Sequence, residues 1–366
     1  MTPRPLTVVI AGGGTGGHLY PGLAVARALL ARRPDARVSF AGTARGLEAR
    51  VVPAEGFELD LIRSAGIKGK SLIARLRGAS MLPVSAVDAW RVVTGRHPHV
   101  VVGVGGYSSG PLVLMAALRG VPTMVLEQNA IPGLTNRWLA PFVRAAAVTY
   151  DSTLTYFRGR GFVAGNPVRP EFLHARTERH GADRPPRVLI LGGSQGAHAL
   201  NMAMVATAPE LVRRCPRIEI LHQTGARDLE MVRRVYRDAG LSARAEPFLD
   251  TVADEMSRAD VVVSRAGATT LAELAALGVP AVLVPFPDAA DDHQRHNALA
   301  LVRQGAAVLV DERTLATEPG RTALVDVLVS LTSDASKRAT MRAAMRTMAK
   351  PEAAEIIVTR LLELAA

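Results

Sequence analysis

The stretch Leu6-Thr-Val-Val-Ile10 followed by Gly12-Gly-Gly-Thr-Gly-Gly17-His18 predicts the fold class of this chain. A short apolar run rich in β-branched residues is typical of a strand that is buried on both faces, as in a parallel sheet. Glycines after such a strand permit a tight turn, and a helical pattern follows over about residues 21–33. Strand, glycine turn and helix in this order indicate an α/β domain with a parallel sheet and crossover helices.

The same order begins again later in the chain, where Arg187-Val-Leu-Ile-Leu191 leads into Gly192-Gly-Ser-Gln-Gly196. Prolines between these two halves break regular structure, and 366 residues are too many for one ordinary core. We therefore predict two Rossmann-like domains whose sheets face each other across a cleft. Their predicted bounds are 1–165 and 166–350, and we expect a final helix at 351–366 to join the first domain.

Further buried strands are predicted from short apolar runs, and the end of the chain has a helical pattern with a break at Pro351. The predicted strands are 37–40, 100–104 and 123–126 in the first domain and 218–222, 245–248, 261–264 and 281–284 in the second, and the helical end is 321–366.

The charge of the chain is distributed unevenly. Lys and Arg number 44 against 33 Asp and Glu, a net charge of +11, and residues 1–165 contain 19 of these cations but only 8 of the anions. The remaining residues contain 25 of each. The first domain is therefore expected to meet an anionic partner such as a nucleic acid, a membrane surface or a phosphorylated substrate.

Composition excludes several classes of protein. The single cysteine, Cys215, rules out an intrachain disulfide and a cysteine-based zinc cluster. No apolar run reaches the roughly 18–20 residues that cross a bilayer. The first residues lead directly into the predicted strand, so we expect no signal peptide.

The spacing of Gly12, Gly14 and Gly17 fits G-x-G-x-x-G, but a dinucleotide site also needs a carboxylate at the end of the second strand. Residues 40–43 contain none, which disfavours a nicotinamide cofactor. The alternative is a tight turn without a ligand. The second turn, 192–196, lacks the Lys-Ser/Thr ending of a P-loop. Two such turns indicate a ligand entering a cleft from each side.

A third cluster, Ser264-Arg-Ala-Gly-Ala-Thr-Thr-Leu-Ala-Glu273, follows a predicted strand and places a helix start with small residues and two hydroxyls at the predicted cleft. Thr270 and Glu273 have the spacing of a capping box, in which Glu273 closes the first turn of the helix. A carboxylate at this place could equally bind two ribose hydroxyls. The pattern alone leaves both roles open.

Taken together, the motifs resemble the MurG family of peptidoglycan N-acetylglucosaminyltransferases. Six of them occur in the order of that family: 12–18, Gly105-Gly-Tyr-Ser-Ser-Gly-Pro111, Glu127-Gln-Asn129, Gly165-Asn-Pro-Val-Arg169, Gly192-Gly-Ser-Gln-Gly-Ala197 and Ser264-Arg-Ala-Gly-Ala268. The resemblance implies a GT-B fold and inverting transfer of GlcNAc from UDP-GlcNAc to the C4 hydroxyl of MurNAc in undecaprenyl-pyrophosphoryl-MurNAc-pentapeptide. It implies no cofactor and no metal ion.

The resemblance also implies which residues bind the donor. Glu273 matches the carboxylate that binds the ribose, Leu249 a backbone contact to uracil, and Gln294 a contact to the sugar. The further donor-site positions are Thr15, Gly16, Gly17, Asn129, Arg169, Ser194, Ala268, Thr269, Thr270, Leu271 and Ala272. The first glycine turn would also face the pyrophosphate of the acceptor.

Inversion needs a base for the acceptor hydroxyl. His18 is one candidate, because a neutral imidazole takes up a proton near pH 7; its alternative role is to hydrogen-bond a phosphate or cap the helix. Glu127 is the other candidate, and its alternative role is to fix its own loop. Asn129 is expected to position a substrate.

The segment from Lys68 to Leu82 mixes leucine and isoleucine with cations at Lys68, Lys70, Arg75 and Arg77. This pattern is typical of a helix on an anionic bilayer, although an ordinary amphipathic helix has it too. With a lipid-linked acceptor implied, we expect peripheral binding to the cytoplasmic side of the cell membrane.

Two other functions are compatible with parts of the pattern. Another GT-B enzyme, such as a nucleotide-sugar epimerase, would share the donor domain and differ in the first domain. A nucleic-acid-binding protein would explain the net charge, but aromatic residues for base stacking are few and no recognised nucleic-acid motif is present.

Overall fold

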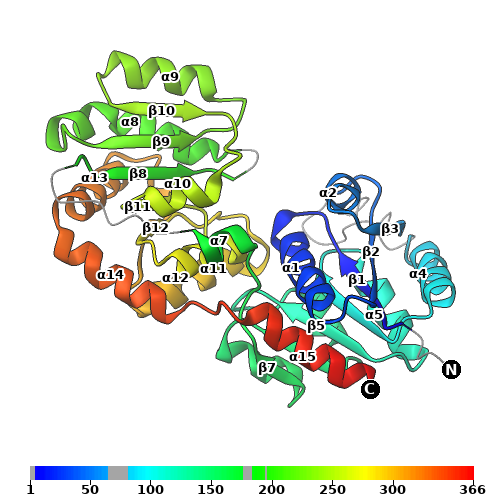
Figure 1. Ribbon diagram of the computed structural model, residues 1–366. Helices are drawn as coiled ribbons and strands as arrows, with labels where there is room; N and C mark the ends of the chain where they lie inside the picture. Colours follow the sequence, from blue (N-terminus) through cyan, green and yellow to red (C-terminus); the bar gives the residue numbers. More distant parts are fainter. Residues whose placement is uncertain (1–4, 65–80, 176–183, 194–195) are drawn as a thin grey trace. The chain divides into compact units, whose positions relative to one another are not determined.

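The computed structural model describes residues 5–64, 81–175, 184–193 and 196–366, which form two α/β units (Figure 1). The first unit contains residues 1–169 and 350–366, and the second contains residues 170–349. The strand pairs of both sheets are parallel, which confirms the predicted fold class.

The sheet of the first unit has the strand order β3-β2-β1-β4-β5-β6-β7. The chain runs outward from β1 to β3 and then returns to β4 on the other side of β1, so the direction of winding switches between β1 and β4. The strands are β1 (Thr7–Gly12), β2 (Arg37–Gly42), β3 (Glu58–Leu61), β4 (Val100–Gly105), β5 (Thr123–Glu127), β6 (Ala145–Val148) and β7 (Gly161–Val163).

Helices cover both faces of this sheet, which is why its central strands are apolar throughout. One face is covered by α1 (Gly16–Arg32), α2 (Glu48–Ala54) and α15 (Ala353–Ala365). The other is covered by α4 (Leu82–Arg96), α5 (Ser109–Leu118), α6 (Leu134–Leu139) and the short helix η1 (Asp151–Phe157). The helix at the C-terminus, α15, packs beside α1 (Figure 1).

The sheet of the second unit has the order β10-β9-β8-β11-β12-β13, and its winding switches between β8 and β11. The strands are β8 (Arg187–Leu191), β9 (Glu219–Gln223), β10 (Ala243–Glu246), β11 (Val261–Ser264), β12 (Ala281–Leu283) and β13 (Ala307–Leu309). This arrangement places the second glycine turn and the Ser264 cluster on adjacent strands, at the same edge of the sheet.

Helices cover both faces of the second sheet as well. One face is covered by α8 (His198–Arg214), α9 (Leu229–Asp238) and α13 (Glu318–Ser333). The other is covered by α7 (Pro170–His174), α10 (Val252–Arg258), α11 (Ala268–Leu277), α12 (His293–Arg303) and α14 (Ala335–Thr347). Short helices η2 (Ala290–Asp292) and η3 (Glu312–Thr314) lie in connections.

Among the predicted boundaries that differ from the structure, two have a clear physical reason. Helix α1 begins at Gly16 rather than at residue 21, because the carbonyl of Thr15 already accepts hydrogen bonds from the N–H groups of His18 and Leu19. Strand β10 ends at Glu246 instead of extending to residue 248, because Pro247 has no N–H to continue the ladder with β9.

Within the described parts of the chain, no helix has both the length and the apolar composition that crossing a membrane requires.

Candidate active site

The glycine turn after β1 lies at the switch point of the first sheet, against the turn that follows β4. A Cβ on Gly106 would lie 2.5 Å from the carbonyl oxygen of Gly13, and a Cβ on Gly12 would lie 2.7 Å from the carbonyl oxygen of Gly105. Gly106 also has a φ of +85°, which L side chains rarely adopt. Both turns therefore need glycine, because their backbones touch. Ligands of open α/β sheets bind at this kind of position.

His18 lies in the first turn of α1 and reaches across to β4. Its Nδ1 is 3.3 Å from the hydroxyl oxygen of Thr15. A Cβ on Gly105, whose φ is +102°, would lie 2.5 Å from Cδ2 and 2.9 Å from Nε2 of the imidazole. The imidazole thus packs on the α-carbon of Gly105, at the carboxyl edge of the sheet, with Thr15, Gly16 and Gly17 directly before it.

Glu127, the last residue of β5, is buried and holds its own loop. Oε1 accepts hydrogen bonds from the backbone and side-chain nitrogens of Asn129, at 3.0 and 3.2 Å. Oε2 accepts from the backbone N–H of Gly133 at 3.0 Å and from the side chain of Asn136 at 2.8 Å. Burial raises the pKa of the Glu127 carboxyl, and these four donors oppose that rise. The Asn129 side chain is directed toward Glu127 and not away from it.

Glu48 is a functional candidate that sequence reasoning missed. Its buried carboxylate accepts a hydrogen bond from the backbone N–H of Gly14 at 2.7 Å and two from Thr43 at 2.8 Å. A carboxylate therefore does lie beside the end of β2, where the sequence indicated none. Its oxygens already accept hydrogen bonds from Gly14 and Thr43. The signal that could have found it is the pair Gly42 and Gly46, which make room for it.

Arg169 lies beside the same turn. Its guanidinium stacks over the ring of Tyr20, 4.8 Å from the ring centre. A Cβ on Gly16 would lie 2.9 Å from Cε2 of Tyr20, so this ring also covers the first residue of α1. A cation is thereby held close to the glycine turn of the first unit.

In the second unit, the turn after β8 packs against the loop after β9. A Cβ on Gly196, whose φ is +77°, would lie 2.0 Å from the carbonyl oxygen of Thr224. A Cβ on Gly192 would lie 2.6 Å from the backbone nitrogen of Ala197. The turn is thus as closely packed as its counterpart in the first unit. Ser194, a predicted diphosphate contact, lies outside the described residues.

A buried hydrogen-bond network supports this turn from below. Asn201, in α8, donates to the carbonyl of Thr224 and to Asp228 at 2.8 Å, and its oxygen lies 3.0 Å from Nε2 of His222. Nδ1 of His222 lies 2.7 Å from the hydroxyl of Tyr236. Burial lowers the pKa of His222 to about 3, so the imidazole is neutral and Nε2 carries the proton donated to Asn201.

The Ser264 cluster forms the start of α11, and the capping box, one of the two roles left open for Glu273, does not form. Gly267 is the N-cap, so Thr270 lies inside the helix and cannot cap it. Residues Ala268, Thr269 and Thr270 form the first turn, and the positive end of the helix dipole at this turn suits an anion. Glu273 lies almost one turn further along and is buried.

Two further residues, which are predicted to contact the sugar-nucleotide donor, lie in a loop and at a helix start of the second unit. Leu249 is buried in the segment that follows β10. Gln294, in the first turn of α12, accepts a hydrogen bond at 3.0 Å from the backbone N–H of Phe286. Its side-chain nitrogen donates to no group within the described ranges, and it remains available to a ligand.

The predicted residues therefore fall into two groups. The first unit contains Thr15, Gly16, Gly17, His18, Glu127, Asn129 and Arg169, and the second unit contains Leu249, Ala268, Thr269, Thr270, Leu271, Ala272, Glu273 and Gln294.

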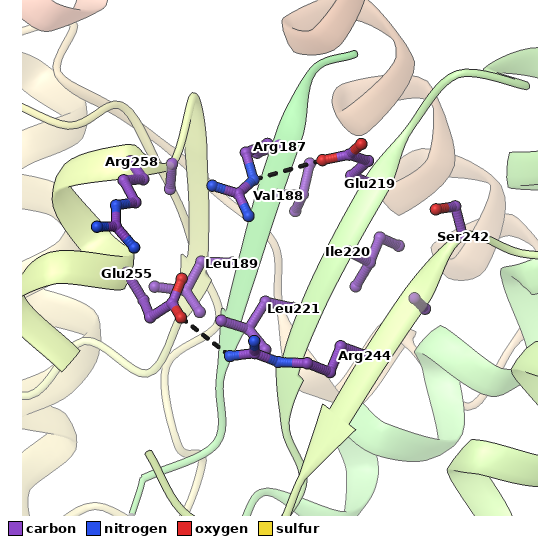
Figure 2. Close-up of a pocket in the computed structure, with 12 residues that line it drawn as sticks. Arg187, Val188, Leu189, Glu219, Ile220, Leu221, Ser242, Arg244, Glu255 and Arg258 are labelled. Carbon is purple, nitrogen blue, oxygen red and sulfur yellow. Dashed lines mark hydrogen bonds and ion pairs between the residues drawn. The ribbon is translucent and has the colours of Figure 1, made fainter. Parts of the chain in front are cut away.

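A cavity of about 300 Å³ lies elsewhere on the second sheet (Figure 2). Arg187, Glu219 and Ser242, at or just before the amino ends of β8, β9 and β10, line it together with residues of α10. Arg187 pairs with Glu219 at 3.4 Å, and Arg244 pairs with Glu255 at 2.9 Å. The cavity is thus at the opposite end of these strands from the glycine turn.

Among the residues that the structure describes, no three histidine, cysteine, aspartate or glutamate side chains are grouped closely enough to hold a metal ion.

Comparison with known proteins identifies relatives along the whole chain. Residues 8–148 match the glycosyltransferase family 28 N-terminal domain, and residues 187–357 match the C-terminal domain of the same family. The UDP-N-acetylglucosamine--N-acetylmuramyl-(pentapeptide) pyrophosphoryl-undecaprenol N-acetylglucosamine transferase of Anaeromyxobacter dehalogenans (strain 2CP-C) is 45% identical, over 98% of this chain and 93% of that protein. The protein of the same name from Pelobacter propionicus is 44% identical, over 98% and 99%.

Comparison with solved structures points to the same family. The crystal structure of Acinetobacter baumannii MurG is 30% identical with a TM-score of 0.80, and the match covers 98% of this chain and 100% of that one. A UDP-GlcNAc 2-epimerase from Neisseria meningitidis, solved with UDP-GlcNAc, has a TM-score of 0.68 over 98% and 99% of the two chains. At 13% identity, that likeness shows a common fold only.

Proposed function

This chain belongs to the MurG family within glycosyltransferase family 28, and from that premise we propose how its two units divide the reaction. It transfers N-acetylglucosamine from UDP-N-acetylglucosamine to N-acetylmuramyl-(pentapeptide) pyrophosphoryl-undecaprenol, a step in peptidoglycan synthesis. The observation that carries the proposal is that each sheet has a closely packed glycine turn at its own switch point.

The proposed chemistry is a single displacement with inversion. The C4 hydroxyl oxygen of the acceptor forms a bond to the anomeric carbon of N-acetylglucosamine, while the bond from that carbon to the β-phosphate oxygen breaks. The electron pair of the broken bond leaves with UDP, and the hydroxyl proton passes to a base.

His18 is the proposed base. It lies at the carboxyl edge of the first sheet, immediately after the glycine turn, where a substrate of an open α/β sheet binds. Glu127 is the weaker candidate because both of its oxygens already accept hydrogen bonds from four amide groups of its own loop. Its hydrogen bonds support the alternative role, in which it fixes that loop and thereby positions Asn129.

The second unit is proposed to bind UDP-GlcNAc. The start of α11 and Ser194 are assigned to the diphosphate, and the positive end of the α11 helix dipole would stabilise the departing charge without a metal ion. Glu273 is assigned to the ribose and Leu249 to the uracil. The side-chain nitrogen of Gln294 is assigned to a hydroxyl of the sugar.

The first unit is proposed to bind the pyrophosphate of the acceptor. The positive end of the helix dipole, at the start of the 17-residue helix α1, suits an anion. Arg169, held over Tyr20, adds a positive charge near the same turn. Binding an anionic acceptor accounts for part of the cationic excess of residues 1–165.

Peripheral binding to the cytoplasmic face of the cell membrane is proposed for the first unit. Most of the segment from Lys68 to Leu82 lies outside the described residues. The helices that follow it, on one face of the sheet, expose large apolar side chains: Leu82 is 51%, Trp90 50% and Trp138 67% exposed. Aromatic side chains beside cations suit the boundary between headgroups and acyl chains.

Charge reversal tests the membrane proposal. A variant with Glu at Lys68, Lys70, Arg75 and Arg77 should bind anionic vesicles much more weakly than the native protein and should retain its affinity for UDP-GlcNAc. The control reverses the exposed Arg234 and Arg237 on α9 of the second unit and should leave vesicle binding unchanged. Undiminished binding by the first variant would refute the proposal.

The reaction itself is tested by incubating the protein with UDP-GlcNAc and a short-chain analogue of the lipid-linked acceptor. UDP release should require the acceptor, and the product should carry a β-linked N-acetylglucosamine at C4. Equal UDP release without acceptor, or conversion of UDP-GlcNAc into its 2-epimer, would instead indicate an epimerase.

A further inference from the structure

The glycine turn of the first unit rests on the buried carboxylate of Glu48. The backbone N–H of Gly14 donates to Oε2 at 2.7 Å, across 34 positions of sequence. Oε1 accepts from the backbone N–H and the hydroxyl of Thr43, both at 2.8 Å. The Glu48 side chain is only 1% exposed. One amide of the turn is therefore directed inward, to the protein, and is not available to a substrate.

Three glycines form a cradle around this carboxylate. A Cβ on Gly13 would lie 2.2 Å from Cδ of Glu48, a Cβ on Gly42 2.5 Å from Cγ, and a Cβ on Gly46 2.1 Å from Oε2. These glycines come from the turn after β1, the end of β2 and the segment before α2. The three segments thus converge on one carboxylate, and an added Cβ at any of the three would collide with it.

The carboxylate is negatively charged at neutral pH. Burial alone would raise its pKa, but the N–H groups of Gly14 and Thr43 outweigh that effect and hold the pKa below its usual range. A fixed negative charge beneath the turn repels an anionic ligand above it. Charge attraction to the acceptor is therefore not what Glu48 supplies, and its contribution is geometric.

We propose that Glu48 is a positioning residue for the transfer: by holding Gly14 inward, it orients the following residues, from Thr15 to His18, toward the acceptor. Thr15 is the N-cap of α1 and is adjacent to Gly14, so the rotation of this peptide sets the direction of the first helical turn. The inference rests on the proposed function, in which that turn binds the acceptor pyrophosphate and His18 takes the proton.

The test compares the variants Glu48→Gln and Glu48→Asp with the native protein. Glutamine has nearly the same shape, but one of its two side-chain heteroatoms can only donate, so it cannot accept from both the Gly14 and the Thr43 amides. We expect Glu48→Gln to lower kcat/KM for the acceptor at least about tenfold and to raise the Kd for UDP-GlcNAc by a clearly smaller factor, since Thr15, Gly16 and Gly17 are also predicted donor-site positions. Glu48→Asp keeps both acceptor oxygens and should recover part of the loss.

The matched control is Glu55→Gln, which removes a carboxylate from the end of the same helix, where it pairs with Arg27 and contacts no part of the turn. It should behave as the native protein does. Native kinetics in Glu48→Gln would overturn the inference, as would an equal loss of donor affinity accompanied by unfolding. If the native protein itself shows no acceptor-dependent UDP release, the proposed function fails instead, whatever the variants do.

Discussion

The imidazole of His18 lies against the α-carbon of Gly105, so closely that a Cβ on this glycine would be 2.5 Å from Cδ2 of the ring. Gly105 ends β4, whereas His18 belongs to the first turn of the helix that follows β1. The contact joins two neighbouring strands at the switch point of the sheet. It makes the position of the proposed base depend on the absence of a side chain on the adjacent strand.

Gly105→Ala should therefore lower turnover strongly. The new methyl group displaces the imidazole, and a φ of +102° adds backbone strain of about 1–3 kcal/mol. We expect kcat to fall at least about tenfold, measured as acceptor-dependent UDP release, with the affinity for UDP-GlcNAc preserved. Gly95→Ala, in α4, is the control: a Cβ there meets nothing within 4 Å, and kcat should not change.

His18→Ala should abolish most of the turnover and leave donor binding intact, because the imidazole is the proposed proton acceptor. Loss of a general base lowers rates by about 10²–10⁴-fold. His174→Ala is the control, because His174 is exposed at the end of α7 and has no proposed role in the reaction; its turnover should not change. Near-normal turnover of His18→Ala at saturating substrates would exclude His18 as the base and would favour Glu127 instead.

Gly196→Ala should weaken binding of UDP-GlcNAc. Its Cβ would lie 2.0 Å from the carbonyl oxygen of Thr224, so the turn after β8 must move away from β9. Gly193→Ala separates backbone strain from steric collision. Gly193 has a φ of +82°, but a Cβ there meets nothing within 4 Å. Calorimetric titration should show a larger loss of affinity for Gly196→Ala than for Gly193→Ala. Equal losses would mean that backbone strain alone is responsible.

Stability should fall below about pH 6.5 because of His222. Its pKa is about 3 in the folded protein and 6.5 as a free side chain, so the unfolded chain binds a proton that the folded protein does not. Folding stability contributed by the neutral imidazole is fully present above pH 6.5 and decreases as the pH falls from 6.5 toward 3. This group alone should reduce the free energy of unfolding by about 2 kcal/mol between pH 7 and pH 5.

His222→Gln tests whether His222 causes this loss of stability, by urea unfolding measured at pH 7 and at pH 5. The variant should be less stable at pH 7, because it disturbs the contacts with Asn201 and Tyr236. It should also lose less stability on acidification than the native protein. An unchanged pH dependence would show that other groups cause the acid sensitivity.

Ile357→Ala should destabilise the first unit. Ile357 is fully buried on α15, which comes from the far end of the chain and packs in the core formed with α1. Removing a buried isoleucine to alanine costs about 2–5 kcal/mol. The neighbouring Ile356 is 38% exposed, so Ile356→Ala should have a much smaller effect. Urea titrations of the full chain measure the free energy of unfolding of both variants.

Much of the fold followed from local patterns of sequence. A β-branched run, a glycine turn and a helical stripe involve residues that are neighbours in the chain, and this pattern occurs twice. Parallel α/β sheets were therefore predictable, and strand boundaries were mostly right. The boundary errors at Pro247 and at the start of α1 arose because backbone hydrogen bonds, rather than hydrophobicity, end a strand or begin a helix.

The identity of the enzyme was also carried by sequence, because six ordered motifs suffice to recognise the family. By contrast, only the tertiary structure placed the carboxylate of Glu48 under Gly14, the ring of His18 on Gly105 and the side-chain amide of Asn201 on the loop after β9. These contacts join residues that are distant in the chain and have no fixed spacing. Sequence specifies which groups are present, whereas the crossing of strands in a sheet decides which of them meet and which are already occupied by the protein itself.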